Sequence, residues 1–474
     1  MHHHPRTPSL AIPALAALFA LAAATACKGE DPSGDDEAGE SDTHGDHGDH
    51  GDHGDHGDTG EALVTFWQDV APIYYESCVS CHREGGIGPF VLDDYATAST
   101  WAAASAHAVD NRVMPPWLVT SDGSCGEWAD SRALDQEQID TILAWVEDGT
   151  PEGTPRDDLS VPELPGLDVV SDEVHTPEFI PEPEGGVFSE FDEYRCFLID
   201  PELDADTFMT GYEVFPGNEA LVHHALLIPV SPEGESDIPG MSNAEVMTAL
   251  DEESPDRLGW PCFGLAGEGV AAEGVPVTWA PGQGVVEFPD DSGYRVGAGD
   301  QYVVQMHYNM ANTALIGQSD STAIRLRYAD EVAKQGYFDV PDGFLDTLFE
   351  DPVALPVGED AVSFTWEVPT DWYIAPGSEQ TQLWGFFPHM HDYGVSLTAR
   401  ILDPEGQEVA CVGDVPRWDF GWQLYYFYEQ PIALLPGHRI EVTCTYDTTG
   451  SPEPIYPGWG THNEMCLAGL YFVP

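Results

Sequence analysis

Apolar residues recur at helical spacing in the first third of the chain, before about residue 150. One helix face is formed by Val64, Trp67, Val70, Ala71 and Tyr74. A second helix is predicted over about residues 93–111. A third runs from Asp135 to Gly149, where Asp135 and Gln138 form a capping box and Gly149 ends the helix. We therefore expect a small helical domain over residues 62–150.

The rest of the chain reads as short strands between Gly- and Pro-containing turns. Residues 395–402 and 408–412 flank Asp403-Pro404-Glu405-Gly406 and predict a β-hairpin. A long run of such strands favours β-sandwiches. Residues 151–187 are rich in Pro, Glu and Asp with little periodicity, which indicates an interdomain linker. The expected fold class is mainly β with an α-helical N-terminal domain.

Charge narrows the set of partners. The 474 residues include 15 basic and 84 acidic side chains, for a net charge of −69. This argues against nucleic acid and anionic lipid head groups as partners, and fits a solubilising surface or cationic partners. The length exceeds what one core normally supports, so two to four domains are expected.

The N-terminus has the features of an export signal over residues 1–26. Arg6 precedes an apolar run from Leu10 to Ala24, and small residues lead to Cys27. A Cys at the cleavage point resembles the lipobox of bacterial lipoproteins, although Ala24 replaces the usual Leu, so plain cleavage is the alternative. No other apolar run is long enough to span a bilayer. We expect export to the periplasm or outer envelope, with membrane contact only through lipidated Cys27.

Residues 27–61 are predicted to be a disordered, acidic and His-rich tether. Five His-Gly-Asp triplets run from His44 to Asp58. Such a density of imidazole and carboxylate would bind Cu(II), Zn(II) or Ni(II) loosely, and a plain linker is the alternative.

Cys78-Val79-Ser80-Cys81-His82 matches the attachment signal of c-type haem. Cys78 and Cys81 would form thioethers, and His82 would take an axial position. A disulfide-forming Cys-x-x-Cys would not need the His. Met114, just before two prolines, resembles the distal ligand of class I cytochromes c, and His107 is the competing ligand. A Met/His pair would raise the haem potential and suit electron transfer.

Two His motifs in predicted strands point to metal. His389 and His391 share one strand face while Met390 opposes them. His223 and His224 are adjacent in an apolar strand, so both reach one ion only if the backbone is bulged there.

Two further residues complete the candidate ligands. His307 shares a face with Gln305 and is assigned as a ligand, whereas Met306 is assigned to the core. Met465 is a soft thioether that suits Cu(I) rather than Zn.

Over residues 188–474 the order of these motifs resembles the copper type II, ascorbate-dependent monooxygenases. The resemblance implies one electron-transfer copper held by three imidazoles and a second copper at which O2 binds and catalysis occurs. These two ligand sets are His223, His224 and His307 for the first, and His389, His391 and Met465 for the second. It also implies two jelly-roll β-sandwiches, at residues 188–345 and 346–474, facing each other across a solvent cleft. The implied reaction is O2-dependent hydroxylation of an aliphatic C–H bond.

The chain departs from the peptide-amidating members of that family. Phe387 stands where they carry an Arg that holds the substrate carboxylate. Leu467, Ala468 and Gly469 replace the stretch where they carry Asn and then Tyr. A carboxylate-terminated peptide is therefore not expected as substrate.

The nine cysteines divide by chemistry. With Cys27, Cys78 and Cys81 assigned, six remain and allow 15 pairings. The resemblance implies a Cys444–Cys466 disulfide, because the family bridges the residue next to its copper Met. Cys196–Cys262 is plausible, and Cys125 and Cys411 remain, either or both of which could be free.

The leading hypothesis is an exported monooxygenase with two copper ions and one covalent haem c, which turns over a small organic substrate. An ascorbate-like reductant or a redox protein would supply electrons, passed from the haem toward the His223-His224-His307 copper. The linker at 151–187 is expected to permit docking of the haem domain without enforcing it. The alternatives are a non-enzymatic copper redox protein and a haem protein whose sandwiches bind partners.

Overall fold

The computed structural model describes residues 63–162, 166–183, 191–262, 265–289, 291–349, 351–460 and 462–474. The predicted signal peptide, Cys27 and the His-Gly-Asp tether lie outside these residues. Within the described ranges, no helix combines the length and apolar character that crossing a membrane requires.

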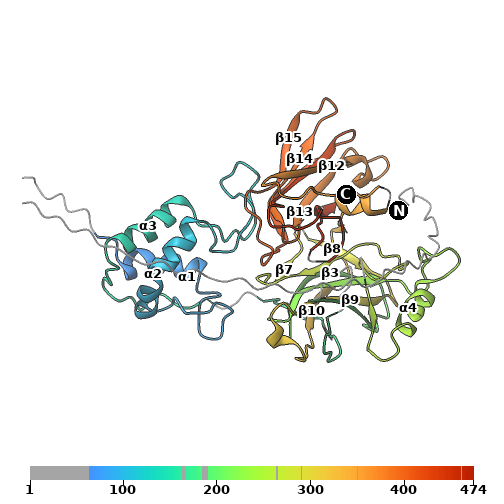
Figure 1. Cartoon of the computed structure of the whole chain (residues 1–474), viewed down its shortest axis with the longest axis horizontal. Helices are drawn as coiled ribbons and strands as arrows, with labels where there is room; N and C mark the ends of the chain where they lie inside the picture. Colours follow the sequence, from blue (N-terminus) through green and yellow to red (C-terminus); the bar gives the residue numbers. More distant parts are fainter. Residues whose placement is uncertain are drawn as a thin grey trace, which may run out of the picture. The chain divides into compact units, whose positions relative to one another are not determined.

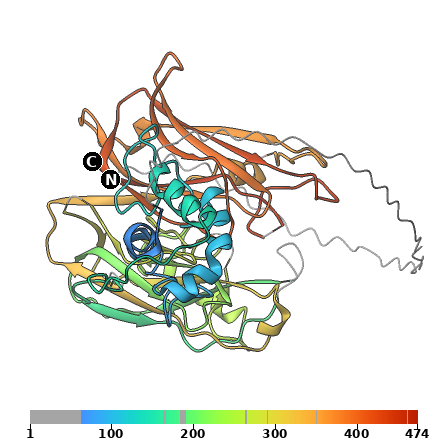
Figure 2. The same ribbon diagram turned by 90° about the vertical axis from the view of Figure 1, so that its left-hand side faces the viewer.

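The first described segment is a helical bundle (Figures 1 and 2). It consists of a short π-helical turn and three helices: Phe66–Val70, α1 (Ala71–Ser77), α2 (Tyr95–Asp110) and α3 (Gln136–Glu147). The predicted capping box of Asp135 and Gln138 is present at the start of α3. Phe66, Tyr74 and Trp145 are buried together in the core that these elements share.

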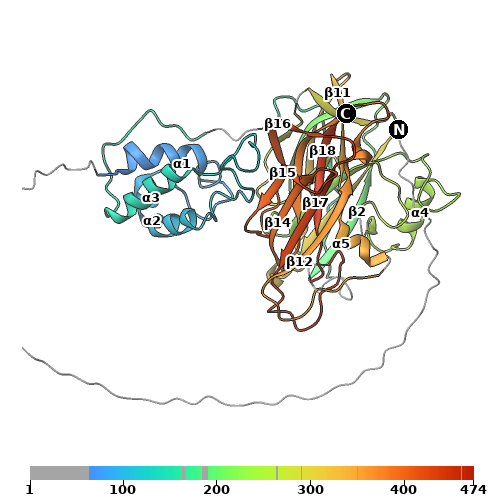
Figure 3. The same cartoon turned by 90° about the horizontal axis from the view of Figure 1, so that it is seen from above.

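Three sheets form most of the regular structure in the rest of the described chain. The largest has the order β1 (Asp172–His175), β10 (Ala323–Ala329), β3 (Thr207–Phe215), β8 (Ser292–Val296), β11 (Lys334–Asp339), β18 (Leu467–Val473), β13 (Thr381–His389), β16 (Tyr426–Leu434), with β7 (Val286–Glu287) paired to β3. The second has the order β12 (Val362–Pro369), β17 (Arg439–Tyr446), β14 (Gly394–Leu402), β15 (Glu408–Val415), seen in Figure 3. The third has the order β5 (Trp260–Pro261), β2 (Asp192–Ile199), β9 (Gln301–Asn309), β4 (Val222–Val230), β6 (Val277–Trp279).

The large sheet contributes to two apolar cores. Its β3 and β8 side chains are buried with those of β2, β4 and β9, while its β13 and β18 side chains are buried with those of β14 and β17. Phe386 and Phe387 lie in different cores because neighbouring strand residues point to opposite faces. Strand β11 pairs in parallel with β8 and antiparallel with β18, so the two halves share one sheet. The mainly β class is confirmed.

Two features differ from the sequence expectations. Helix α4 (Asn243–Glu252), with a capping box of Ser242 and Glu245, lies beyond the region where helical periodicity was expected to end. Its apolar buried residues are Val246 and Met247, so its face is too narrow to give a clear repeat. Strand β1 lies inside the stretch expected to be a linker. The remaining helical turns are α5 (Gly343–Asp346), Thr313–Leu315, Thr347–Phe349 and Thr370–Tyr373.

The predicted hairpin is confirmed, with β14 and β15 antiparallel on either side of a turn. Gly406 has a φ of 81° in that turn, a conformation that favours glycine. Disulfides join Cys196 to Cys262 and Cys444 to Cys466, the two pairs expected from the sequence. A third joins Cys125 to Cys411, the two cysteines that the sequence left open.

Candidate functional site

His223, His224 and His307 come together on β4 and β9, which are hydrogen-bonded neighbours in one sheet. Val222 pairs with Tyr308 and His224 with His307, and the register shifts between Val222 and His224. This is the bulge that two adjacent histidines need in order to face the same way. The Nδ1 atom of His224 lies 3.4 Å from Nδ1 of His223 and 3.3 Å from Nδ1 of His307.

The electrostatics of this cluster suit a cation. Burial, reinforced by neighbouring imidazoles, lowers the pKa of His223 and of His224 well below the ordinary value. Both rings are therefore neutral near pH 7 and have a lone pair to donate. One ligand atom from each histidine lies within 4.8 Å of the other two. Ring nitrogens that face one another in this way are well placed to bind one copper ion.

Asp192 on β2 lies behind this cluster. Its Oδ1 is 3.2 Å from Nε2 of His307, off the line of a regular hydrogen bond, and accepts a hydrogen bond from Asn309 Nδ2 at 2.8 Å. The carboxylate is fully buried. A carboxylate next to one ring nitrogen favours the tautomer that leaves the other nitrogen, here Nδ1, free for a metal.

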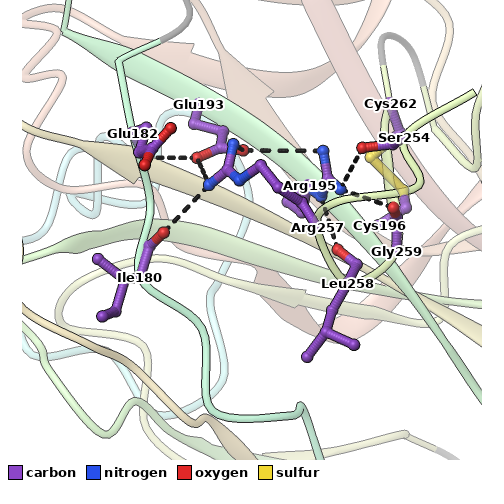
Figure 4. Close-up of polar contacts among 10 residues, drawn as sticks. All are labelled: Ile180, Glu182, Glu193, Arg195, Cys196, Ser254, Arg257, Leu258, Gly259 and Cys262. Atoms are coloured by element: carbon purple, nitrogen blue, oxygen red, sulfur yellow. Dashed lines mark hydrogen bonds and ion pairs between the residues drawn. A yellow bond between two sulfur atoms is a disulfide. The ribbon is translucent and has the colours of Figure 1, made fainter.

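A buried ionic network holds the strand that carries Asp192 (Figure 4). Glu193 accepts hydrogen bonds from Arg257 Nη1 at 2.6 Å and Nη2 at 2.9 Å. Arg195 donates to the carbonyl groups of Leu258 and Gly259. Because Glu193 and Arg195 are both buried and paired, β2 has a fixed register beside the histidines.

His389 is the last residue of β13 and His391 follows just beyond it; both are buried, and Met390 lies in the opposing core as expected. His389 Nδ1 is 2.6 Å from Gln423 Oε1, and His391 Nδ1 is 3.0 Å from the carbonyl oxygen of Asn463. Both partners are acceptors, so each Nδ1 carries the proton and each Nε2 is left as the ligand atom. Burial lowers the pKa of His389 to about 4 and of His391 to about 3, so both are neutral near pH 7.

Glu464 ties the His-x-His segment to Met465. Its carboxylate accepts backbone N–H bonds from His391 at 2.9 Å, Tyr393 at 2.7 Å and Met465 at 3.2 Å. Burial raises the pKa of Glu464 to about 8, against the lowering effect of these three donors. The Cys444–Cys466 disulfide follows directly, and the Tyr446 hydroxyl donates to the Met465 carbonyl at 2.8 Å.

One cavity of about 320 Å³ contains residues of both clusters, among them His224, His389, His391 and Met465. The ring centroids of His224 and His389 are 6.4 Å apart. Residues of both clusters therefore line one cavity, to which the first cluster contributes His224. Most of the wall is apolar, formed by Leu226, Leu265, Val275, Trp279, Val340, Leu345, Phe387, Trp459 and Leu467.

The charged side chains on the cavity wall are acidic. Asp342 and Asp346 line it, and no Lys or Arg is found among its described lining residues. Asp342 accepts N–H bonds from Phe344, Leu345 and Cys466, and burial raises its pKa to about 7. Phe387 lines the cavity as an apolar side chain, so the position offers nothing for a carboxylate.

The Cys78–His82 segment follows α1. Cys78 and Cys81 are unpaired among the described residues. His82 Nδ1 is 3.0 Å from the carbonyl oxygen of Phe90, which fixes the ring and leaves Nε2 as the ligand atom. Burial raises the pKa of the Cys78 thiol to about 12, which does not suit a reactive redox cysteine. These residues fit covalent haem attachment.

The two candidate distal ligands lie elsewhere. Met114 lines a second cavity of about 500 Å³ whose described wall includes Trp117 and Arg417 but none of the Cys78–His82 segment. His107 is exposed on α2, with Asn111 within hydrogen-bond distance of its ring. Met114 as distal ligand stays a prediction.

Several residues that support the clusters were missed from the sequence. Asp192, Gln423 and Asn463 contact the histidines, and Glu464 accepts a backbone N–H bond from His391. The sequence did offer one signal, the adjacent acids Asp192 and Glu193 at the start of an apolar strand. Buried acids need partners, so this pair indicated a polar or metal-binding neighbour.

Comparison with known proteins agrees with this geometry. Residues 373–474 match the family model described as copper type II ascorbate-dependent monooxygenase, C-terminal domain. Human dopamine beta-hydroxylase is 26% identical over 353 residues, covering 72% of this chain and 52% of the relative. Human DBH-like monooxygenase protein 1 is 24% identical over 266 residues, covering 54% and 40%.

Tyramine beta-hydroxylase of Caenorhabditis briggsae is 23% identical over 292 residues, covering 59% of this chain and 45% of the relative. This chain thus spans about half the length of the curated relatives it matches. A solved infectious bursal disease virus structure matches over 62% of this chain and 74% of that chain, at 9% identity. Its TM-score of 0.18 is too low to indicate a shared fold. The chain is thus similar to copper type II, ascorbate-dependent monooxygenases, and the match to the C-terminal domain of that family covers residues 373–474.

Proposed function

We propose that the chain is a copper-dependent monooxygenase that hydroxylates an aliphatic C–H bond of a small organic substrate with O2. The observation that carries this proposal is the single cavity that contains ligands of both histidine clusters and Met465. A copper store would need the ligands but not an apolar chamber beside them.

The two clusters offer different donor sets and would therefore have different roles. His223, His224 and His307 offer three neutral imidazoles, a set that serves copper in both oxidation states. His389, His391 and Met465 offer two imidazoles and a thioether, which favours Cu(I). Copper held there would supply one-electron redox chemistry and activation of O2.

The protein's own contribution is to orient the ligands and exclude water. Gln423 and Asn463 hold the rings of His389 and His391 so that Nε2 is presented, and Glu464 fixes the backbone between His391 and Met465. The apolar wall, including Trp279 and Phe387, would limit the access of water to the cavity. A dry, preorganised site strengthens the electrostatic interactions inside it.

The cavity indicates a substrate without negative charge. Its volume is at the small end of ligand sites, and its charged wall residues are Asp342 and Asp346. Two relatives are named for dopamine and tyramine. A neutral or cationic small molecule with an aliphatic C–H therefore fits, and a glycine-extended peptide, whose carboxylate would meet no cation, should not be turned over.

The electron supply is the second part of the proposal. Cys78 and Cys81 would bind one haem c covalently, with His82 and Met114 as its axial ligands. An ascorbate-like reductant or a redox protein would reduce it. The three disulfides fit an oxidising compartment, and lipidation at Cys27 would anchor the chain there.

The test is a product screen with isotopically labelled O2. Copper- and haem-loaded protein with ascorbate should insert one labelled oxygen atom into a neutral or amine substrate, with O2 uptake matched to product. His389→Ala should abolish product, whereas the exposed control His175→Ala should not. O2 uptake without labelled product across the screen would overturn the proposal.

A further inference from the structure

The connection between α2 and α3 leaves the helical bundle. We call residues 117–132 the docking loop. Leu118, Val119 and Trp128 of this loop are buried with side chains of β13, β14, β17 and β18, in a core that we call the C-terminal sandwich. The loop is thus part of the helical segment by sequence and part of the sandwich by packing.

Backbone hydrogen bonds fix the register of the docking loop. Thr120 N donates to the Asp414 carbonyl at 2.8 Å, and its hydroxyl donates to the Asp414 carboxylate at 2.7 Å. Ala129 N donates to the Phe427 carbonyl at 2.8 Å, and Glu429 N donates to the Glu127 carbonyl at 2.9 Å. These contacts place the loop along β15 and β16.

The attachment is also covalent. Cys125 of the docking loop forms a disulfide with Cys411 on β15, a separation of 286 residues along the chain. Cys125 is buried and Cys411 is half-buried. A link across so long a loop strongly restricts how far the helical segment can separate from the sandwich.

Aromatic rings continue from the loop toward the His-x-His strand. Trp117, three residues after Met114, meets the Tyr426 ring edge to face at 4.9 Å between centroids. The Tyr426 hydroxyl accepts a hydrogen bond from Leu118 N at 3.2 Å. Tyr426 pairs with Phe386 on β13, and His389 ends that strand.

A second contact leads to the same histidine. Arg132, the last residue of the docking loop, donates to the Gly282 carbonyl at 3.0 Å. A side chain at Gly282 would collide with the Trp422 ring, so the two are in close contact. Gln423, the next residue, bonds His389.

We propose that the docking loop is a fixed interface that joins the haem-bearing segment to the His389-His391-Met465 side of the enzyme through the Trp117–Tyr426 contact. This inference rests on the proposed function. It differs from the sequence expectations that docking is optional and that electrons arrive at the His223-His224-His307 cluster. Cys78, Cys81 and His82 would hold the haem, and His389, His391 and Met465 would hold the copper ion. One electron would then pass from ferrous haem to Cu(II) with no bond broken, and an external one-electron reductant would restore ferrous haem.

The first test measures attachment without activity. A specific protease site inserted after Pro155, next to exposed Asp157, would cut between the two parts. The proposal predicts that the halves stay covalently joined until a reductant is added, and co-elute afterwards through the remaining loop contacts. Halves that separate without reductant would overturn it.

The second test measures electron transfer by following haem absorbance. Ferrous, copper-loaded Trp117→Leu should oxidise at least tenfold more slowly than wild type, and Cys125→Ser/Cys411→Ser should also be slower. Ascorbate-driven product formation should stay within twofold in both. Trp372→Leu, at an exposed ring on a different surface turn, is the matched control.

Unchanged haem oxidation in Trp117→Leu would overturn the electron route. Absence of ascorbate-driven product in the wild type would instead refute the proposed function, while the protease test would still decide the attachment.

Discussion

Removing the Glu464 side chain should loosen the segment that carries His391 and Met465. Its carboxylate receives N–H bonds from His391, Tyr393 and Met465, and it is fully buried. Glu464→Ala leaves three buried donors to unpair or to find water, at about 1–3 kcal/mol for each that stays unsatisfied. Allowing for partial hydration, we expect the free energy of unfolding to fall by about 3–6 kcal/mol.

The assay has two parts. Urea unfolding of the copper-free protein gives the stability change, and competition with a Cu(I) chelator gives the affinity of each site. The Cu(I) affinity of the His389-His391-Met465 site should fall at least about tenfold, equivalent to about 1.4 kcal/mol, while that of the His223-His224-His307 site is unchanged. Glu453→Ala, at an exposed glutamate on the same connection, should match wild type. Wild-type stability and wild-type copper affinity in Glu464→Ala would refute the reasoning.

Three further substitutions test other parts of the site. Met465→Ala should keep the fold and the haem but lose hydroxylation and the sulfur signal in copper X-ray absorption; wild-type turnover in the copper-loaded variant would remove Met465 from the site. Asp192→Asn should weaken copper binding at His223-His224-His307 by about 10–100-fold with the other site unchanged, measured by titration and copper resonance spectra; equal affinities would show that the 3.2 Å contact has no positioning role. Burial raises the pKa of Asp342 from 3.8 to about 7. The difference in free energy of unfolding between wild type and Asp342→Asn should therefore be most favourable to wild type below about pH 4. It should decline as the pH rises toward 7, by up to roughly 4 kcal/mol. Urea unfolding between pH 4 and 8 measures this, and a pH-independent difference would contradict it.

The direction in which neighbouring side chains point was predictable from the sequence wherever the two-residue repeat of a strand determines it. The period of two in a strand puts His389 and His391 on one face and Met390 on the other, and the structure has them so. The bulge at His223-His224 followed from the same rule, because adjacent histidines cannot otherwise face together. The capping box at Asp135 needed only neighbouring residues.

Long-range features were not predictable. The Cys125–Cys411 pair joins residues on different elements, and no local pattern distinguishes it from the alternatives. The parallel pairing of β11 with β8, which joins the halves into one sheet, also depends on the packing of the whole chain. The ring centroids of His224 and His389 are 6.4 Å apart, a distance that follows from that packing and that no local sequence pattern could give.

The most direct test of the account is a count of tightly bound copper. A chain shortened to begin at Glu61 removes the His-Gly-Asp triplets, and a chelator wash removes weakly bound metal before mass spectrometry. The account predicts two copper ions per chain, and one each in His307→Ala and in Met465→Ala, with the haem absorbance unchanged in both variants. A count near zero in the shortened wild-type chain, or a count that neither substitution lowers, would contradict it.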